Sequence, residues 1–504
     1  MRLIAKGKCS ALPLTLSDAK FSAMDHRSNR REFLKLGVLA TASLYSTPLI
    51  SLAQDLVRPG PAKRIVIVGA GLAGLTAAYE LTQAGHDVTI LEAQGHPGGR
   101  VRTLRDPLAD GLYAELGAAR IPDNHEWTLK YVKLFGLPLV PFYPATGRST
   151  TFLRNIRAEA EPGGTPDLRQ FRLNLTPDEL ALGVNGLIDK ALGPALHLAE
   201  DRSVWPPPAL ARADHMTVRE FLLDRGLSAD AFEALGFQPF VRTSALEAIT
   251  LISSGHSGKQ LNKIAGGNDQ LPKAFAARLA DKIIYGAPVQ RIEQEKTGVA
   301  AIYSQHGASG RITADKLICT VPFPVLRRIE IAPRLSPQKV RVIHEMPYGS
   351  LSRVTFQVKE RYWLREGLNG FASTDIPGEI WSSAHDRPGS RGLLQLYLQG
   401  PSSERASKMS EDERIRYAIE QVERVFPGLR KHLEQANSQC WDNDEWSGGA
   451  TRLLNVGQVT AFHNEARRPE GHIHFAGEHT STWFGWMNGA IESGSRAARE
   501  VNNS

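Results

Sequence analysis

Residues 63–74 read KRIVIVGAGLAG, a β-branched run that leads into glycines at Gly69, Gly71 and Gly74. The run predicts a buried strand, and LTAAYELTQAG after it predicts an amphipathic helix. Glycines at this spacing permit a tight turn, close approach of a pyrophosphate to the backbone and close packing of helix on strand. A second strand, DVTILE, ends at Glu92, whose carboxylate suits ribose hydroxyls. Glycines alone also serve ordinary turns, but this whole order favours a dinucleotide site in a Rossmann-like α/β domain.

A second glycine-rich turn, GGRVRT, follows at residues 98–103. From here the chain resembles the flavin amine oxidase superfamily, in the family's order, through LNKIAGGNDQLPKAFA (261–276), LICTVPFPVLRRI (317–329) and HFAGEHTSTWFGWMNGAIESGSRAA (474–498). The resemblance spans nearly everything after residue 62 and implies FAD rather than NAD as the cofactor. The residues that it assigns to FAD are Gly69, Gly71, Gly74, Glu92, Gly99, Arg100, Ala119, Arg120, Val289, Glu478, Trp486 and Met487.

Because these motifs are far apart, the FAD-binding domain is expected to be discontinuous. Insertions between its pieces supply a mixed-sheet substrate domain, suggested by strand-like stretches such as SRVTFQVKE, and a helical subdomain, suggested by runs such as PDELALGVNGLIDKALG. The expected segments are 60–105, 255–325 and 440–504 for FAD binding, 106–149 and 326–439 for the substrate domain, and 150–254 for the helical subdomain.

The stretch AELGAARIP (114–122) places Arg120 directly behind small and apolar residues. An arginine cannot lose its charge, so burial demands a partner. Similar stretches in L-amino-acid oxidases of the superfamily read ELGAMRLP, and their arginine holds the substrate carboxylate in a bidentate pair. An ion pair with Glu115 or Asp123 is the alternative. The resemblance thus implies that Arg120 binds a substrate carboxylate.

Three more residues complete the catalytic set that the resemblance implies. Gly485 and Trp486 would hold the amino group, and Arg353 stands where the superfamily usually keeps a lysine near flavin N5. The tyrosine that helps to bind carboxylate in venom-type enzymes is missing from STDIPGEIWSS, where Trp381 or Ser382 falls nearby. A hydroxyl or an indole N–H could replace it.

The segment WSGGAT (446–451) places Ala450 and Thr451 where monoamine oxidases carry a flavin-linked cysteine and a cage tyrosine, so the FAD is expected to be non-covalent. Only Cys319 and Cys440 follow the leader, with no metal-ligand spacing. Two free thiols are expected, although one disulfide between them stays open. No metal is expected.

The expected reaction is oxidation of an L-amino acid by oxygen to a 2-oxo acid, ammonia and hydrogen peroxide. An L-amino-acid 2-monooxygenase, a monoamine or polyamine oxidase, and a flavin-bearing binding protein with a dead site are the alternatives. A carotenoid-desaturase-type enzyme shares the nucleotide motif but not GWMNGAIESG. The accepted side chains do not follow from the sequence, and a homodimer is one assembly that stays open.

Residues 1–53 hold eight Lys or Arg and three Asp or Glu, so only +2 of the net charge of +7 belongs to the rest. That surplus does not predict nucleic-acid binding. NRREFLK (29–35) and the modest apolar run after it, ending in SLA at residues 51–53, resemble a twin-arginine export signal, with Met24 as an alternative start. The run is too short and broken for a stable membrane anchor, so a bacterial periplasmic or secreted enzyme is expected.

If NRREFLK directs export of the folded, flavin-loaded protein, replacing Arg30 and Arg31 together by lysine strands the oxidase inside the cell. Oxidase activity in periplasmic and cytoplasmic fractions measures this. Unchanged export of the double variant would show that the arginine pair is accidental.

Overall fold

The computed structural model describes most of the chain, namely residues 56–256, 258, 260–375 and 378–504. The expected export signal at residues 1–53 lies outside this part. Within the described ranges, no helix combines the length and apolar character needed to cross a membrane. Cys319 and Cys440 are both buried and unbridged, which confirms the expectation of free thiols.

A parallel five-stranded sheet, ordered β10–β2–β1–β14–β23, organises the nucleotide-binding half. The strands are β1 Arg64–Val68, β2 Asp87–Leu91, β10 Ile283–Ile284, β14 Lys316–Cys319 and β23 Ile473–Phe475. They confirm the Rossmann-like α/β expectation. The strands fall within the three separated segments assigned to FAD binding, while the domain boundaries themselves stay a prediction.

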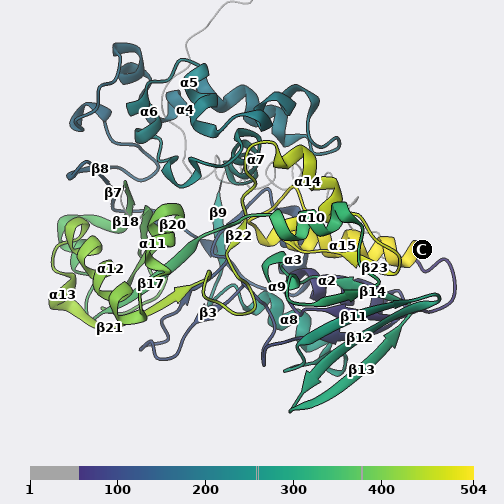
Figure 1. The fold of residues 1–504 in the computed structure, drawn as a ribbon. Coiled ribbons are helices and arrows are strands. Elements are labelled where there is room, and N and C mark those ends of the chain that lie inside the picture. The colour runs from purple at the N-terminus through teal and green to yellow at the C-terminus, as the bar shows by residue number, and fades with distance from the viewer. Residues whose placement is uncertain (1–55, 257, 259, 376–377) are drawn as a thin grey trace, which may run out of the picture. The chain divides into compact units, whose positions relative to one another are not determined.

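Both faces of this sheet are covered (Figure 1). Ile65 and Ile67 of β1 pack with a helical layer, whereas Val66 and Val68 pack toward a second sheet, ordered β13–β12–β11–β15. A strand buried on both faces is what a continuous β-branched run predicts. The helices are α2 Leu72–Gln83, α3 Glu126–Leu134, α8 Gln270–Arg278 and α15 Met487–Asn503; the strands are β11 Val289–Glu295, β12 Gly298–Gln305, β13 Ala308–Ala314 and β15 Glu330–Ala332.

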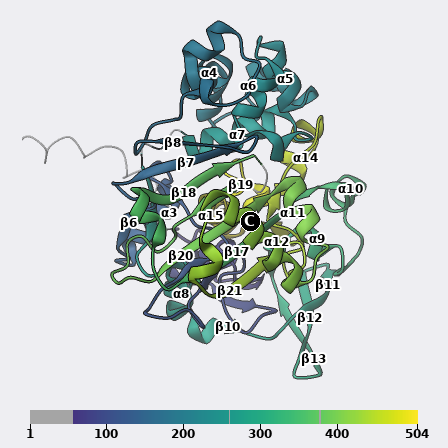
Figure 2. The same cartoon turned by 90° about the vertical axis from the view of Figure 1, so that its left-hand side faces the viewer.

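A seven-stranded mixed sheet, ordered β21–β17–β20–β19–β18–β7–β8, forms the second lobe (Figure 2). Apolar residues of its strands pack against the helices that follow β20. The strands are β7 Arg148–Leu153, β8 Ile156–Ala160, β17 Leu351–Val358, β18 Leu368–Thr374, β19 Gly378–Trp381, β20 Gly392–Gln399 and β21 Leu433–Cys440; the helices are α11 Gly400–Ala406, α12 Glu411–Val425 and α13 Leu429–His432.

The hairpin of β7 and β8 departs from the helical subdomain expected over residues 150–254. Its turn residues Arg154 and Asn155 both have positive φ, 50° and 64°, as a two-residue type I′ turn requires. This turn lacks the Asn-Gly or Asp-Gly pair that is typical of such a hairpin, so the hairpin could not be predicted from the sequence. The helical segment therefore begins only at α4.

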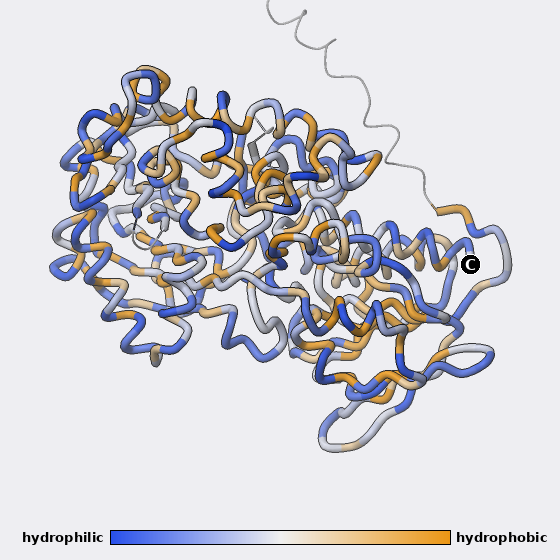
Figure 3. Tube along the Cα trace, turned by 45° about the horizontal axis from the view of Figure 1, so that its top comes forward, coloured by the Kyte–Doolittle hydropathy of each residue, from blue (hydrophilic) through white to orange (hydrophobic). Residues whose placement is uncertain are grey.

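The helical region packs as one layer at the top of Figure 1. Its longest helix, α4, starts at a capping box of Thr176 and Glu179 and is interrupted at Gly183, where φ is 61°. Its helices are α4 Pro177–Glu200, α5 Val218–Asp224, α6 Ala229–Ala234 and α7 Ala245–His256. Hydrophobic stretches run through the interior of the described fold and hydrophilic ones follow its outer turns (Figure 3).

The carboxyl ends of β1, β14 and β23 meet at one edge of the parallel sheet, where Thr320 Oγ1 donates to Val68 O at 2.8 Å. Ligands of open α/β sheets bind at such an edge. The remaining elements connect the lobes: β3 Thr103–Leu104, β4 Ala114–Glu115, β5 Ile121–Pro122, β6 Leu139–Pro141, β9 Leu261–Ile264, β16 Tyr348–Gly349, β22 Thr451–Arg452, α9 Phe323–Leu326, α10 Pro337–Glu345 and α14 Gln458–Arg467.

Candidate active site

A cavity of about 490 Å³ opens at this edge. It extends from Glu92 after β2 to Arg120 and Glu379 on the side of the mixed sheet. The residues that the sequence assigned to FAD and to the catalytic set all line this cavity, except Gly74, which lies behind the glycine turn. The structure therefore gathers residues that are hundreds of positions apart into one site.

The glycine turn at the end of β1 has the geometry of a phosphate cradle. Gly69 has a φ of +107°, and a Cβ at Gly74 would lie 1.9 Å from Gly69 O. A Cβ at Gly71 would meet nothing within 4 Å, so it would project into open space where Gly71 lines the cavity. The missing side chains thus leave room for a pyrophosphate beside the first N–H groups of α2.

Glu92 is a buried carboxylate that the backbone holds in place. Its Oε2 accepts from Ala70 N at 2.6 Å and its Oε1 from Gln94 N at 2.8 Å. Burial raises its pKa, and these two N–H groups oppose that shift. No Lys or Arg of the described residues forms an ion pair with it, and a carboxylate has about four acceptor sites. The free sites fit ribose hydroxyls.

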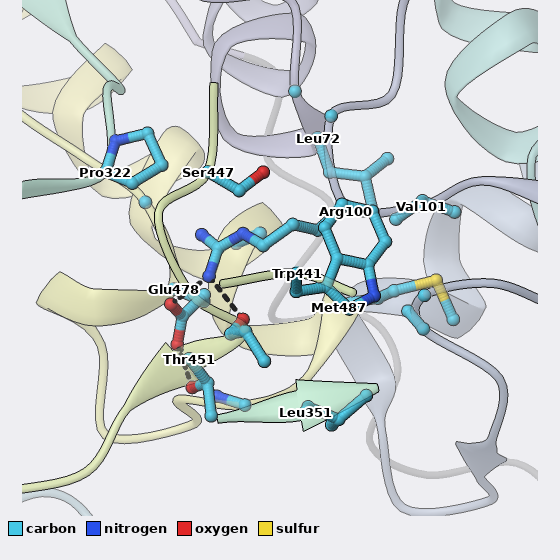
Figure 4. A pocket seen from close by; sticks show the side chains of 18 of the residues that line it. Leu72, Arg100, Val101, Pro322, Leu351, Trp441, Ser447, Thr451, Glu478 and Met487 are labelled. Atoms are coloured by element: carbon cyan, nitrogen blue, oxygen red, sulfur yellow. Dashed lines mark hydrogen bonds and ion pairs between the residues drawn. The ribbon is translucent and has the colours of Figure 1, made fainter. Parts of the chain in front are cut away.

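Glu478, in a 3₁₀ turn after β23, is the centre of a hydrogen-bond network (Figure 4). Arg100 Nη1 donates to its Oε1 at 2.8 Å and to Ala450 O at 2.6 Å, while Thr451 Oγ1 and Gly485 N donate to its Oε2 at 2.8 and 2.9 Å. Burial opposes ionisation of Glu478, but Arg100 and the other donors outweigh it and lower the pKa. The Nη1 donor of Arg100 is therefore engaged by the protein, which leaves its other N–H groups for a phosphate.

Trp486 precedes α15 in extended conformation and forms a wall of the cavity. The His125 ring packs edge-on against its indole at a centroid distance of 4.9 Å, and His125 Nε2 donates to Ser254 O at 2.8 Å. Burial lowers the pKa of His125 to about 4, so the ring is neutral. A Cβ at Gly255 would lie 2.8 Å from the indole. Trp486 is thus wedged between two elements, with the N-terminus of α15 beside it at Met487.

Arg120 faces the cavity with a side chain that is 21% exposed. Its Nη1 donates to Glu379 Oε2 at 3.2 Å, so its ion pair is with Glu379 rather than with Glu115 or Asp123. The guanidinium also lies 5.0 Å from the ring centroid of Trp381, whose Nε1 donates to the same Glu379 oxygen at 2.6 Å. One carboxylate therefore holds both donors.

Arg353 on β17 is 3% exposed and lines the same cavity. Its Nη1 donates to Glu115 O at 2.6 Å, and its guanidinium lies 4.8 and 4.7 Å from the rings of Trp381 and Tyr397. Burial lowers its pKa. Neither Trp381 nor Ser382 lines the cavity, because the Trp381 indole is turned to Glu379. The expectation that one of them replaces the missing tyrosine stays a prediction, and Tyr397 is the hydroxyl-bearing residue of β20 that lines the cavity.

Sequence reasoning missed three residues of this site, namely Glu379, Tyr397 and His125. A signal was present in GLLQLYLQG, where Gln395, Tyr397 and Gln399 alternate with leucines and so share one face of β20. Glu379 shares a face of β19 with Trp381 for the same reason. Nothing local marks His125, which reaches the site only through packing.

Comparison with known proteins assigns the chain to a family. Residues 72–502 match the flavin-containing amine oxidoreductases. The chain belongs to this family. The flavin-dependent L-tryptophan oxidase RebO of Lentzea aerocolonigenes is 32% identical, covering 87% of this chain and 98% of its own. An L-amino-acid oxidase of Echis ocellatus is 30% identical, covering 87% and 89%. Wild-type putrescine oxidase bound to putrescine has the same fold, with a TM-score of 0.75 at 22% identity over 88% of this chain and all of that one.

This amine oxidoreductase uses FAD, as its family does. The glycine cradle, Glu92 and the N-terminus of α15 fit the pyrophosphate, ribose and ring ends of that cofactor. No cysteine of the described residues lines the cavity, and Ala450 lies at its wall. Among the described residues, no group of His, Cys, Asp and Glu is arranged to hold a metal ion.

Because a thioether needs a cysteine at the flavin, we predict that FAD is bound without a covalent link. Acid precipitation of the purified oxidase should release all yellow colour into the supernatant. A precipitate that keeps flavin absorbance would contradict this, and Ala450→Cys provides a variant in which such a link has the required sulfur.

Glu115 supports the site from behind Arg353 and is 3% exposed. Its carboxylate accepts from Asn268 N at 2.7 Å and Thr103 Oγ1 at 2.8 Å. Burial, the largest effect, raises its pKa from 4.5 to about 7. Its contribution to stability is therefore fully present below pH 4.5 and is lost as the pH rises to 7.

We predict that Glu115→Gln removes this dependence, since the amide copies the protonated carboxyl. Between pH 5 and 7 the free energy of unfolding of the wild type should fall by about 1 kcal/mol per pH unit more than that of the variant. Thermal unfolding midpoints of both proteins at pH 5 and pH 7 measure the difference. Parallel pH profiles would show that the buried carboxyl titrates normally.

Proposed function

We propose that this enzyme is an L-amino-acid oxidase, which converts an L-amino acid, oxygen and water into a 2-oxo acid, ammonia and hydrogen peroxide. The observation that carries the proposal is the state of Arg120. It meets Glu379 through one N–H at 3.2 Å, has the Tyr143 hydroxyl as a neutral partner, and lines the cavity. A guanidinium fork with free donors suits the two oxygens of a carboxylate.

The opposite corner of the cavity suits the α-amino group. Gly485 has a φ of +76°, in a conformation that favours glycine, and its N–H is already bound to Glu478. Its carbonyl and the face of Trp486 are left for the substrate. The names of RebO and the Echis enzyme, both oxidases of L-amino acids, support the same substrate class.

Bound FAD supplies the redox chemistry, because it takes two electrons with hydrogen from a C–H bond and passes them to oxygen. The protein's own part is orientation. Arg120 would hold the carboxylate and the Gly485–Trp486 corner the α-amino group. The Cα–H bond is then fixed in one orientation. Positioning of this kind is worth roughly 7–11 kcal/mol of barrier. The buried Arg353 adds a fixed positive charge within the cavity.

One observation favours a second candidate, an amine oxidase. The Arg120–Glu379 pair satisfies both charges without a substrate carboxylate, and the fold is shared with putrescine oxidase. An amino-acid monooxygenase would differ in releasing an amide in place of the 2-oxo acid.

We predict that Arg120→Met lowers kcat/KM for L-amino acids by on the order of a hundredfold, because charged hydrogen bonds contribute roughly 1.5–3 kcal/mol each. The sharper measurement is preference. The wild type should strongly prefer an L-amino acid over its decarboxylated amine, and the variant should lose most of that preference. Peroxide release with both substrates gives the two ratios.

Arg157→Met is a matched control, since the Arg157 side chain is 25% exposed and also ion-paired but lies on β8, away from the cavity. It should keep both rate and preference. A wild type that oxidises the amine as well as the amino acid would replace the L-amino-acid oxidase proposal by the amine oxidase one.

A further inference from the structure

Glu379 lies where the active-site cavity meets a second, outer cavity of about 820 Å³. Among the residues that the structure describes, Gly236, Pro239, Glu379 and Gln399 line both. Among these four, Glu379 is the single charged residue. A substrate held at Arg120 that extends toward the outer cavity therefore comes next to this carboxylate.

Half of the Glu379 carboxylate is unused within the described part of the chain. Both of its donors, Arg120 Nη1 and Trp381 Nε1, bind the same oxygen, Oε2, at 3.2 and 2.6 Å. No hydrogen bond is formed to Oε1, and the side chain is 27% exposed. Oε1 is therefore an open acceptor at the junction of the two cavities.

A substrate carboxylate on Arg120 changes the electrostatics of Glu379. The guanidinium would then serve two carboxylates, its own partner and the substrate's, and these repel each other at short range. A positive group of the substrate beside Oε1 would remove that repulsion and form a charge-assisted hydrogen bond. The α-amino group does not supply it, because the corner assigned to that group is formed by Gly485 and Trp486.

The outer cavity has the chemistry to hold the end of such a side chain. Apolar side chains and side chains with hydroxyl or amide groups line it together, and Asp375 contributes a second carboxylate, whose Oδ1 is buried and has no hydrogen-bond partner. The one cation among its described lining residues, Arg405, is exposed to solvent. With two carboxylates and one exposed cation in its described lining, the compartment beyond Glu379 favours a positively charged group over a negatively charged one.

We propose that Glu379 is the residue that determines side-chain specificity and that it selects L-amino acids with a cationic side chain, such as L-lysine and L-ornithine. This rests on the proposed function, because it takes Arg120 as the site of the α-carboxylate. Glu379 accepts the distal ammonium through Oε1 while Oε2 keeps its protein donors.

Comparison of L-lysine with L-norleucine, which has the same four-carbon side chain without the ammonium, tests the proposal on the unmodified holoenzyme. The wild type should show a kcat/KM for L-lysine that is at least about tenfold higher, the gain expected of one charge-assisted hydrogen bond. Equal rates, or a preference for L-norleucine, would overturn the role of Glu379 and leave the L-amino-acid oxidase proposal standing.

Glu379→Gln isolates the charge, because the amide oxygen can still accept from Arg120 and Trp381 and only the negative charge at Oε1 is lost. The variant should lose on the order of tenfold to a hundredfold in kcat/KM for L-lysine. For L-norleucine it should keep or gain activity, since the repulsion with the α-carboxylate is gone. A parallel fall for both substrates would mean that Glu379 only keeps Arg120 in place, against the proposal.

Glu434→Gln is the matched control. The Glu434 side chain is also 27% exposed and paired with an arginine, but it lies on β21 and lines neither cavity. It should leave the lysine-to-norleucine ratio unchanged, and flavin absorbance shows that both variants are folded and loaded. A control that shifts the ratio as much as Glu379→Gln does would overturn the assignment.

Two amines, cadaverine and 1-aminopentane, distinguish a failure of this proposal from a failure of the L-amino-acid oxidase proposal on which it rests. If the wild type oxidises these amines and neither amino acid, the L-amino-acid oxidase proposal fails. A preference for cadaverine that Glu379→Gln abolishes would then support Glu379 as the acceptor of a distal ammonium, and equal rates for the two amines would refute it.

Discussion

The buried carboxylate of Glu478 is the constraint on which the rest of the site depends. It joins Arg100, after the glycine turn, to Thr451 and to Gly485, so segments separated by hundreds of residues converge on two oxygen atoms. An ionised group in such a place is tolerated only when its partners are in position, and removing one partner of a buried pair costs about 3–5 kcal/mol. The same contacts place the N-terminus of α15 at the cavity. The requirement to satisfy one charge thus aligns the phosphate end of the site with its substrate end.

How much of the site the sequence predicts depends on how local each contact is. The glycine turn, Glu92 and the start of α15 were predictable because their chemistry follows from residues close together in the chain and from the main-chain geometry of one strand–helix unit. The partner of Arg120 was not. Glu115 and Asp123 were the acidic residues nearest in sequence, yet the ion pair is formed with Glu379, 259 positions away. Only the pairing of β19 within the mixed sheet brings that carboxylate to the cavity, and no periodicity near Arg120 reports it.

The fold likewise contains elements that the sequence predicts and elements that it does not. RIVIV was predictable as a doubly buried strand because both neighbouring layers require apolar residues. The β7–β8 hairpin was not predictable, since Arg154 and Asn155 adopt positive φ in a turn that carries no glycine. Register decides the substrate wall in the same way, because residues two apart share a face and residues one apart do not. Thus Tyr397 of β20 lines the cavity, whereas Leu396 and Leu398 beside it face the opposite side of the sheet.

Trp381 explains how two cations and one carboxylate coexist at the substrate end. An indole has a negative face and a positive edge. The ring of Trp381 lies 5.0 Å from the Arg120 guanidinium and 4.8 Å from that of Arg353, while its N–H holds Glu379 at 2.6 Å. A lysine in place of Arg353 could lose its proton on burial, whereas an arginine cannot, so its charge has to be satisfied by the protein at every pH. Here Glu115 O accepts from its Nη1 and the rings of Trp381 and Tyr397 lie against the guanidinium, while its buried Nε has no hydrogen-bond partner. Arg353 therefore does not pair with Glu379, and the free oxygen of that carboxylate stays available to the substrate.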